Sequence, residues 1–376
     1  MHANINNQIV FYASFDGYFC NMKQKKLKVA LVYNEPHPEM YKIPAKKEET
    51  IDFVPYFEVE KITPMQEYEI MANRLSKAGF DAYTLNIKDN IFNFISDYKR
   101  NNPDVVFNFV EIYKDKPYLE MNVVSLYELL GVAYTGAPPM ALANCQNKQL
   151  AKRILSSAGI LTPHFIYFDK IQKSYNHKLK YPVIVKPAFE DASVGIENSA
   201  IVTDNKSLKK RIEFVIDHFK QPALCEEFID GRELNVAVIG DEKPLALPIS
   251  EIDFSQMPDH LYNIVSYQAK WDPFHEAYHK TIPICPAKLP KKIEKQAKEI
   301  ALRAFRIMGV RDYARIDMRL SKDNQLYVLE VNPNPDLTEG AGFMRSSHAA
   351  GYSYVKTLSK IIMLAYNRRK KNHFFS

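Results

Sequence analysis

The stretch from Asp312 to Leu337 reads DYARIDMRLSKDNQLYVLEVNPNPDL and decides the fold of the C-terminal part of the chain. Two runs rich in β-forming residues, Tyr313 to Leu320 and Gln325 to Val331, flank a polar Ser-Lys-Asp-Asn segment. This pattern predicts an antiparallel hairpin whose turn is centred on Asp323 and Asn324.

Strand periodicity gathers polar side chains on one face of this hairpin. A turn at that position places Asp317 directly opposite Glu330, and Arg315 opposite Asn332. The other face is then apolar and carries Ile316, Met318, Leu329 and Val331.

Two opposed carboxylates repel each other by roughly 0.2–1 kcal/mol across a strand pair, so a cation between them is expected. Oxygen ligands of this kind suit Mg²⁺, which borrows further ligands from water and phosphate. The alternative is a solvated sheet face, because exposed alternation is common in antiparallel sheets. The pair alone leaves both interpretations open.

Bulk composition narrows the class of protein. The length of 376 residues predicts two or three domains, and 46% hydrophobic with 25% charged residues is typical of a soluble globular protein. Scattered lysines and a net charge of +6 do not indicate nucleic-acid binding, and no apolar run is long enough to span a bilayer. The four distant cysteines, without metal-ligand spacing, favour a reducing cytoplasm.

The N-terminal part predicts a doubly wound α/β domain. After residues 1–21, which we interpret as an extension or a misassigned start, strands are expected in KLKVALVYN from Lys26, before Ile87 and over Asp104–Val110. Helical runs ending at Gly79 and Gly131 alternate with them. Such alternation is typical of a parallel sheet.

Further along, a helical run is expected over Pro138–Ala158 and a capped helix over Val202–Phe219. Lys291–Met308 predicts an amphipathic helix that leads into the hairpin, and a last helix is expected near Tyr354–Tyr366.

Two motifs in this part contain side chains suited to ligand binding. Lys186 ends an apolar strand directly before a proline, and the loop after it, with Ser193 and Gly195, offers a hydroxyl and backbone N–H groups to a phosphate. Glu226 to Ile229 mixes acceptors with an apolar shelf, which suits adenine. Each motif taken alone also fits an ordinary surface lysine or a solvated strand end.

The order of Lys148, VIVKP with its Ser-Val-Gly loop, CEEFIDGRE, YQAKW, ARID and LEVNPNP resembles the ATP-grasp superfamily, most closely the D-alanine–D-alanine ligase family. The resemblance implies an ATP-grasp fold, with α+β character, behind the α/β domain. The expected parts are an N-terminal domain over 22–137, a central subdomain over 138–229 and a C-terminal subdomain over 230–376.

The resemblance also implies roles for individual residues. Arg315, Lys270 and Ser193 match catalytic groups, and Asp317, Glu330 and Asn332 match ligands of two Mg²⁺ ions, for which Mn²⁺ is an alternative. ATP contacts are implied for Lys148, Lys186, Ser193, Gly195, Glu226, Glu227, Phe228, Ile229, Glu233, Lys270 and Leu329.

The implied reaction joins a carboxylate to an amine through an acylphosphate, with small-molecule substrates, a cytoplasmic location and a possible homodimer. Lysines and Mg²⁺ neutralise the transferring phosphoryl group, and Arg315 stabilises the oxyanion. Positioning and charge, without a side-chain nucleophile, supply the catalysis.

Departures from the family pattern affect the substrates. NFVEIYKDKPYLE stands where such ligases carry a His-Gly signature, and Asp336 and Ala341 stand at a glycine and at a carboxylate-binding serine. An aspartate there argues against D-alanine and for a cationic second substrate, with Arg345 and Ser346 as a displaced anchor. The alternatives are a genuine D-alanine–D-alanine ligase and a nucleotide-binding protein without turnover.

Overall fold

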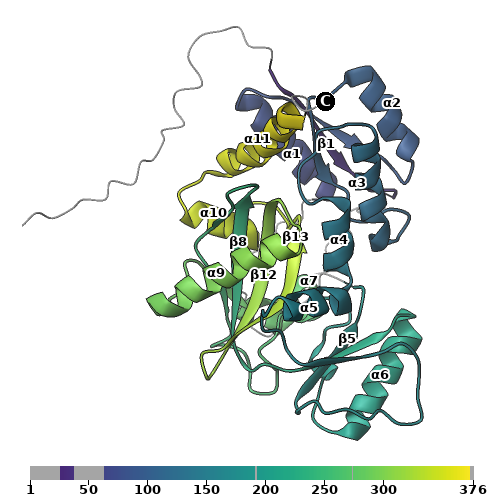
Figure 1. Cartoon of the computed structure of the whole chain (residues 1–376), viewed down its shortest axis with the longest axis vertical. Coiled ribbons are helices and arrows are strands. Elements are labelled where there is room, and N and C mark those ends of the chain that lie inside the picture. The colour runs from purple at the N-terminus through teal and green to yellow at the C-terminus, as the bar shows by residue number, and fades with distance from the viewer. Residues whose placement is uncertain (1–25, 38–62, 191–192, 273, 373–376) are drawn as a thin grey trace, which may run out of the picture.

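The computed structural model describes residues 26–37, 63–190, 193–272 and 274–372. The interpretation of residues 1–21 and most of the polar loop before Thr63 therefore lie outside the described residues. The chain builds three sheets stacked along the long axis of the molecule (Figure 1).

A parallel sheet in the order β2-β1-β3 forms the upper part, as the alternating pattern predicted. Its strands are β1 (Lys28–Tyr33), β2 (Asp81–Asn86) and β3 (Val105–Phe109). Its helices are α1 (Pro64–Lys77), α2 (Ile91–Asn101), η3 (Pro117–Leu119) and α3 (Glu120–Leu129). The sheet is covered on both faces, because Val29 and Leu31 pack in one apolar cluster with α1, whereas Ala30 and Val32 pack in another with α2 and α3.

The C-terminal helix α11 (Tyr354–Asn372) returns to this first sheet. It lies beside α1 in Figure 1, and its apolar residues Leu358, Ile361 and Ile362 share a cluster with Leu31. The last helix is thus longer than the predicted 354–366 and closes the face of the N-terminal sheet.

Two helices, α4 (Pro139–Gln146) and α5 (Lys148–Ser157), connect the upper part to the rest of the chain. The prediction of one helical run over 138–158 was wrong at Asn147, whose backbone is extended (φ −81°, ψ 93°). The Asn147 side chain accepts a hydrogen bond from the Leu150 N–H and so starts α5. This break sets the direction of the helix that carries Lys148.

A small antiparallel sheet in the order β4-β7-β5-β6 forms the lower part. Its strands are β4 (Phe165–Phe168), β5 (Val183–Pro187), β6 (Ile201–Val202) and β7 (Ala223–Glu227). The helix α6 (Asn205–Phe219) covers one face through Leu208, Ile212 and Val215, and the Asp204 side chain caps its start. The capped helix predicted over 202–219 is thus present, except that Val202 belongs to β6. The short helix η4 (Asn198–Ala200) precedes β6.

A larger antiparallel sheet occupies the middle, in the order β11-β10-β8-β12-β13 with β9 beside β8. Its strands are β8 (Gly231–Gly240), β9 (Leu245–Ala246), β10 (Ser250–Asp253), β11 (Ile282–Ile284), β12 (Asp312–Ser321) and β13 (Leu326–Pro333). Its helices are α7 (Tyr267–Trp271), α8 (Glu276–Lys280), α9 (Lys291–Ile307) and α10 (Gly342–Ala349).

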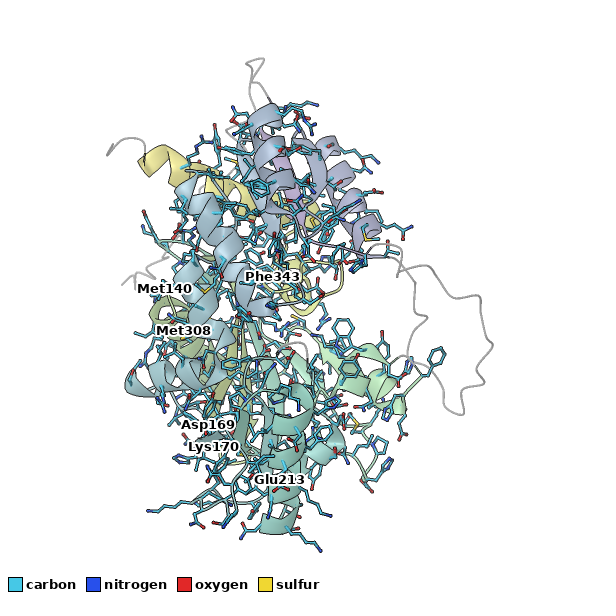
Figure 2. All side chains as sticks on the ribbon, turned by 90° about the vertical axis from the view of Figure 1, so that its right-hand side faces the viewer. Met140, Asp169, Lys170, Glu213, Met308 and Phe343 are labelled. Carbon is cyan, nitrogen blue, oxygen red and sulfur yellow. The ribbon has the colours of Figure 1, made fainter. Side chains whose placement is uncertain are left out.

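Helices cover both faces of this middle sheet. The predicted amphipathic helix α9 packs Ala297, Ala301 and Phe305 against one face, and α10 packs the fully buried Phe343 against Tyr313 on the other. In Figure 2 Phe343 lies midway along the molecule. The polar hairpin face at the β13 edge is thereby held between the upper and lower parts.

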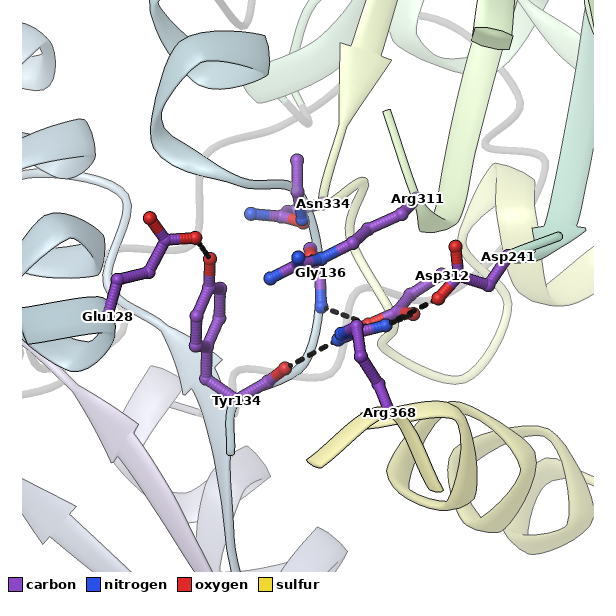
Figure 3. Close-up of polar contacts among 9 residues, drawn as sticks. Glu128, Tyr134, Gly136, Asp241, Arg311, Asp312, Asn334 and Arg368 are labelled. Carbon is purple, nitrogen blue, oxygen red and sulfur yellow. Dashed lines mark hydrogen bonds and ion pairs between the residues drawn. The ribbon is translucent and has the colours of Figure 1, made fainter. Parts of the chain in front are cut away.

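A buried ion pair joins α11 to the start of β12. Arg368 donates to both carboxylate oxygens of Asp312, at 2.7 and 2.9 Å, and also to Asp241 and to the Tyr134 carbonyl (Figure 3). The second oxygen of Asp312 accepts from the Gly136 N–H at 2.8 Å. This network ties the C-terminal helix, the connection into α4 and the β12–β13 hairpin together.

Candidate active site

The hairpin ladder pairs Asp317 with Glu330 and Arg315 with Asn332, which confirms the register predicted from sequence. The ladder shifts by one residue directly beyond this pair, where Met318 faces Val328. Leu329 is therefore the extra residue of a β-bulge, which locally re-aims side chains.

The bulge corrects one prediction about the apolar face. Val328, not Leu329, is the buried neighbour of Met318, and Leu329 is half-buried beside Glu330. The expectation that Leu329 shares the core face with Ile316 was wrong, because alternation restarts at the bulge. Its position next to Glu330 remains compatible with the nucleotide contact implied for Leu329.

The Asp317 carboxylate receives four hydrogen bonds. Arg315 donates from Nε and Nη2, each at 2.8 Å, and the amides of Asn332 and Asn235 donate at 2.8 and 2.7 Å. Burial raises the pKa of Asp317, and the Arg315 guanidinium works in the opposite direction. Asp317 is thus held in place by residues of three adjacent strands.

Asn235 is a site residue that the sequence reasoning missed. It faces Asp317 across the β8–β12 ladder and is buried. The available signal was periodicity, because Asn235 follows Glu233 by two positions on β8 and so shares its face.

Glu330 lies among cations from other elements. Its Oε2 is 3.9 Å from Nζ of the buried Lys148 on α5, and its Oε1 accepts from Asn332 at 3.2 Å. Burial opposes its ionisation, but Lys148, Lys186 and Arg315 outweigh burial and lower the pKa of Glu330 to about 2. The carboxylate therefore stays charged at neutral pH.

The two glutamates at the end of β7 point in different directions. Glu226 is buried and contacts Lys186 at 3.0 Å and Lys152 at 3.3 Å, whereas Glu227 accepts from the Lys180 N–H at 2.9 Å. The alternative interpretation of this motif, a solvated strand end, is therefore excluded for Glu226. Lys152, one turn after Lys148 on α5, is a second residue that the sequence reasoning missed.

Beyond β7 the chain forms a partly apolar wall. Phe228 lies 5.8 Å from the Tyr262 ring, and the Arg319 guanidinium stacks 5.6 Å from the Phe228 ring. Arg319 also forms an ion pair with Glu233 at 2.8 Å. Burial raises the pKa of Glu233, although Arg319 works against this rise.

The loop that follows Lys186 is docked against the segment that leads to Lys270. The Ser193 hydroxyl donates to the Val265 carbonyl at 2.9 Å, and the Tyr267 N–H donates to the Ile196 carbonyl at 2.7 Å. The Gly195 backbone has φ +74°, and a Cβ there would lie 2.7 Å from the Pro187 ring. Loop and helix α7 therefore approach the site as one unit.

Lys270 completes the cationic side of the site. Lys270 is an exposed residue. Partial loss of water around its ammonium group lowers the pKa of Lys270, and the nearby positive charge of Arg315 lowers it further. The guanidinium groups of Arg345 and Arg315 both lie beside Gly342. A Cβ atom added to Gly342 would lie 3.6 Å from Arg345 Nη2 and 3.8 Å from Arg315 Nη1.

Acidic groups surround Tyr68 near the carboxyl end of the parallel sheet, where ligands bind in open α/β sheets, and one of them, Asp336, also acts on Lys270 and Arg345. Burial first, and then the charges of four carboxylates, raise the pKa of Tyr68 on α1 well above its ordinary value. These carboxylates are Glu111, Asp336, Glu35 and Glu67. The exposed Asp336 accepts from the N–H and hydroxyl of Thr338.

Comparison with known proteins identifies this arrangement. Residues 154–363 match the family model described as D-ala D-ala ligase C-terminus. The chain belongs to this family. The D-ala D-ala ligase C-terminus match covers the central and lower sheets and the first half of α11, and it includes every site residue named from the sequence except Lys148.

Among its relatives, the uncharacterized protein y4sG of Sinorhizobium fredii is 31% identical over 251 residues, which are 67% of this chain and 71% of that protein. The D-alanine--D-alanine ligase of Carboxydothermus hydrogenoformans is 31% identical over 258 residues, 66% of this chain and 78% of that enzyme.

A crystal structure of the Bacillus anthracis D-alanine--D-alanine ligase complexed with ATP shares the fold. Its TM-score is 0.67 at 24% identity, over 93% of this chain and 100% of that chain. The predicted ATP-grasp fold behind a doubly wound parallel sheet is confirmed. The chain is an ATP-grasp enzyme, an ATP-dependent carboxylate–amine ligase, so the alternative without turnover is set aside.

Among the residues that the structure describes, no helix combines the length and the apolar character that crossing a membrane requires.

Proposed function

We propose that ATP and two Mg²⁺ ions bind between the lower sheet and the β12–β13 hairpin. Lys148 and Lys186 would contact the phosphates under the loop of Ser193 and Gly195. The residues assigned to adenine, ribose and the adjoining wall are Glu226, Glu227, Phe228, Ile229, Glu233 and Leu329. The observation that carries the proposal is geometric: Asp317 and Glu330 are opposed on the hairpin ladder, Arg315 contacts Asp317 at 2.8 Å, and Lys148 approaches Glu330 at 3.9 Å.

The donor chemistry fits Mg²⁺, with Mn²⁺ as the alternative ion. Asp317, Glu330 and Asn332 supply oxygen ligands from directly opposed strands. Within the described ranges no cluster of three or more His, Cys, Asp or Glu side chains is placed to hold a metal ion. The proposal takes the remaining ligands from phosphate and water oxygens, which is the usual way in which Mg²⁺ binds at nucleotide sites.

In the proposed reaction the substrate carboxylate first takes the γ-phosphoryl group of ATP, which converts it into an acylphosphate with a good leaving group. The metal ions supply charge neutralisation at the phosphoryl group when bound. Lys270 and the docked Ser193 loop position that group. Arg315 is held in place by Asp317, and its proposed role is to stabilise the oxyanion that forms when the amine attacks.

The amine substrate is proposed to be cationic beyond a single α-amino group, as in a basic amino acid or a polyamine. Asp336 acts on Lys270 and Arg345 at the cationic end of the site, Glu67 is close enough to Asp336 for their charges to interact, and Arg345 offers a partner for a carboxylate. Ser346 is fully buried, so the displaced anchor reduces to Arg345. The second candidate is the joining of two D-alanines, which the names of the relatives favour.

A single screen separates these candidates. ADP release is measured with MgCl₂ and ATP against pooled L-amino acids, D-amino acids, dipeptides and polyamines, followed by mass spectrometry of the active pools. A product lighter by one water than two substrates, one of them cationic, is the expected result. Activity with D-alanine alone would select the second candidate.

Assembly and location complete the proposal. A homodimer in the cytoplasm is proposed for this ligase, as the family resemblance implies. Light scattering on the purified full chain tests the dimer, and a monomeric mass at micromolar concentration would reject it.

A further inference from the structure

Three charged side chains from three elements are buried together beside the proposed nucleotide site. Lys152 on α5 is 1% exposed, Glu226 on β7 is 1% exposed and Lys186 on β5 is 8% exposed. Lys152 Nζ lies 3.3 Å from Glu226 Oε2, and Lys186 Nζ lies 3.0 Å from Glu226 Oε1. One carboxylate thus serves two ammonium groups.

The two lysines differ in their freedom to leave Glu226. Lys152 is fixed by a second hydrogen bond, donated from Nζ to the Thr162 hydroxyl at 2.8 Å, and it lies 5.9 Å from the Phe165 ring. Lys186 ends its strand next to the phosphate loop and also acts on Glu330. Lys152 therefore has a second fixed partner beside Glu226, whereas Lys186 lies nearer to the proposed phosphate site.

The electrostatics support this division. Burial, and secondarily the Lys186 charge, lower the pKa of Lys152 to about 8 against the opposing influence of Glu226 and Glu330. Burial also disfavours the charged form of Glu226, but Lys152 and Lys186 together hold the pKa of Glu226 below its ordinary range. Without Lys152, the charge on Glu226 depends on Lys186 alone.

We propose that Lys152 is a positioning residue for nucleotide selection, which keeps Glu226 ionised and fixed while Lys186 turns to the triphosphate. The inference rests on the proposed nucleotide site. It adds a role for a lysine that touches neither phosphate nor metal ligand in that proposal.

The chemistry of selection follows from the charge state of Glu226. An ionised carboxylate only accepts hydrogen bonds, so it matches the 6-amino group of adenine and rejects the 6-oxo group of hypoxanthine. A protonated carboxyl group has a donor and an acceptor and accommodates either base. Loss of Lys152 therefore erodes discrimination between the two purines.

The test compares ATP with inosine triphosphate (ITP) in equilibrium binding to the full chain with MgCl₂, without carboxylate or amine substrates. The wild type is expected to bind ATP more tightly than ITP by roughly ten- to hundredfold, the range of a hydrogen bond to a charged group. In Lys152→Met this ratio is expected to fall at least about fivefold, mainly through weaker ATP binding.

Matched variants separate this role from a general loss of structure. Lys170→Met makes the same change at an exposed lysine of the lower part, labelled in Figure 2, and is expected to keep the wild-type ratio. If Lys152→Met does not fold, Thr162→Val removes the hydroxyl that orients Lys152 and is expected to lower the ratio about twofold or more.

The outcomes distinguish the assignment of adenine to Glu226 from the role of Lys152. A wild type that binds ATP and ITP equally would overturn the assignment of adenine to Glu226, and with it this inference. A wild type that prefers ATP, with an unchanged ratio in folded Lys152→Met, or in Thr162→Val where the first variant does not fold, would overturn the role of Lys152 alone.

Discussion

Asp317 on β12 and Glu330 on β13 are directly opposed ladder partners, and the β-bulge at Leu329 begins directly beyond them. Each carboxylate has its own cationic partner. Arg315 pairs with Asp317 at 2.8 Å, and Lys148 approaches Glu330 at 3.9 Å. The repulsion expected from the sequence is thus relieved by two cations from different elements.

Replacing either carboxylate is expected to abolish turnover. Asp317→Asn or Glu330→Gln removes one anionic metal ligand, so kcat for ADP release should fall by at least about 10²-fold. The measurement is ADP release with the substrates that the screen identifies, with circular dichroism as the check on folding.

Asp323→Asn is the matched control, because it makes the same change at the exposed hairpin turn. It is expected to retain full activity. Turnover near the wild-type rate in a folded Asp317→Asn or Glu330→Gln protein would remove the metal assignment.

Asn235→Ala is expected to weaken metal use without removing a ligand. Asn235 donates to Asp317 Oδ1 at 2.7 Å, and outer-shell partners of this kind are worth about 10- to 100-fold in metal affinity or activity. The expected result is a higher Mg²⁺ concentration for half-maximal rate, read from a titration at saturating ATP. An unchanged Mg²⁺ dependence would limit Asn235 to a structural role.

The hairpin register was predictable because alternation and a polar turn specify it locally. The pairing of Asp317 with Glu330 nevertheless depends on two departures from the predicted hairpin. The Ser321 N–H donates to the Gln325 carbonyl, so the turn shifts the pairing by one residue, and the bulge at Leu329 shifts it back. Periodicity contains no information about a bulge, so the error at Leu329 was inherent in that reasoning.

Contacts between distant elements lie beyond local patterns. Lys152 and Glu226 are 74 positions apart in sequence, and their ion pair exists only because α5 packs near the end of β7. Asn235 was hidden for the same reason, since an isolated asparagine in an apolar strand has many ordinary explanations. Spacing located the residues on single strands, whereas tertiary packing selected their partners.

Glu226 is expected to make stability pH-dependent on the acid side. Its pKa is lowered in the folded state from an ordinary value of 4.5, so its contribution is present above that value and is lost as the pH falls below it. At pH 7, Glu226→Gln should cost about 3–5 kcal/mol, because two buried ammonium groups lose their partner.

Urea unfolding between pH 7 and pH 3.5 measures this effect. The difference in unfolding free energy between wild type and Glu226→Gln is expected to shrink below about pH 4.5. Glu213→Gln on α6, where the pair with Lys209 is more exposed at 3.9 Å, should show a small difference at all pH values. A difference independent of pH would contradict the assigned charge state.

Asp312 is expected to be the strongest single contributor in the network of Figure 3. It is fully buried and bonded to Arg368 through both oxygens, so Asp312→Ala should lower the free energy of unfolding by about 3–5 kcal/mol. Asp241→Ala removes the more exposed partner of Arg368 and should cost less than about 1 kcal/mol. Both variants are compared by thermal unfolding. Equal decreases in the free energy of unfolding for Asp312→Ala and Asp241→Ala would show that burial does not decide which carboxylate contributes more.

Asp336 is expected to select the amine substrate. Its charge acts on Lys270 and Arg345 and on Glu67, so it lies where the proposed cationic amine meets the reacting centre. Asp336→Asn keeps the acceptor for the Thr338 N–H but removes the charge, and should lower kcat/KM for a cationic amine by about tenfold, since the site is exposed. The KM for ATP should not change, because the assigned nucleotide contacts lie on other elements. Initial rates at varied amine and varied ATP separate these two effects. A variant with unaltered or improved kcat/KM would favour a neutral amine acceptor such as the α-amino group of D-alanine.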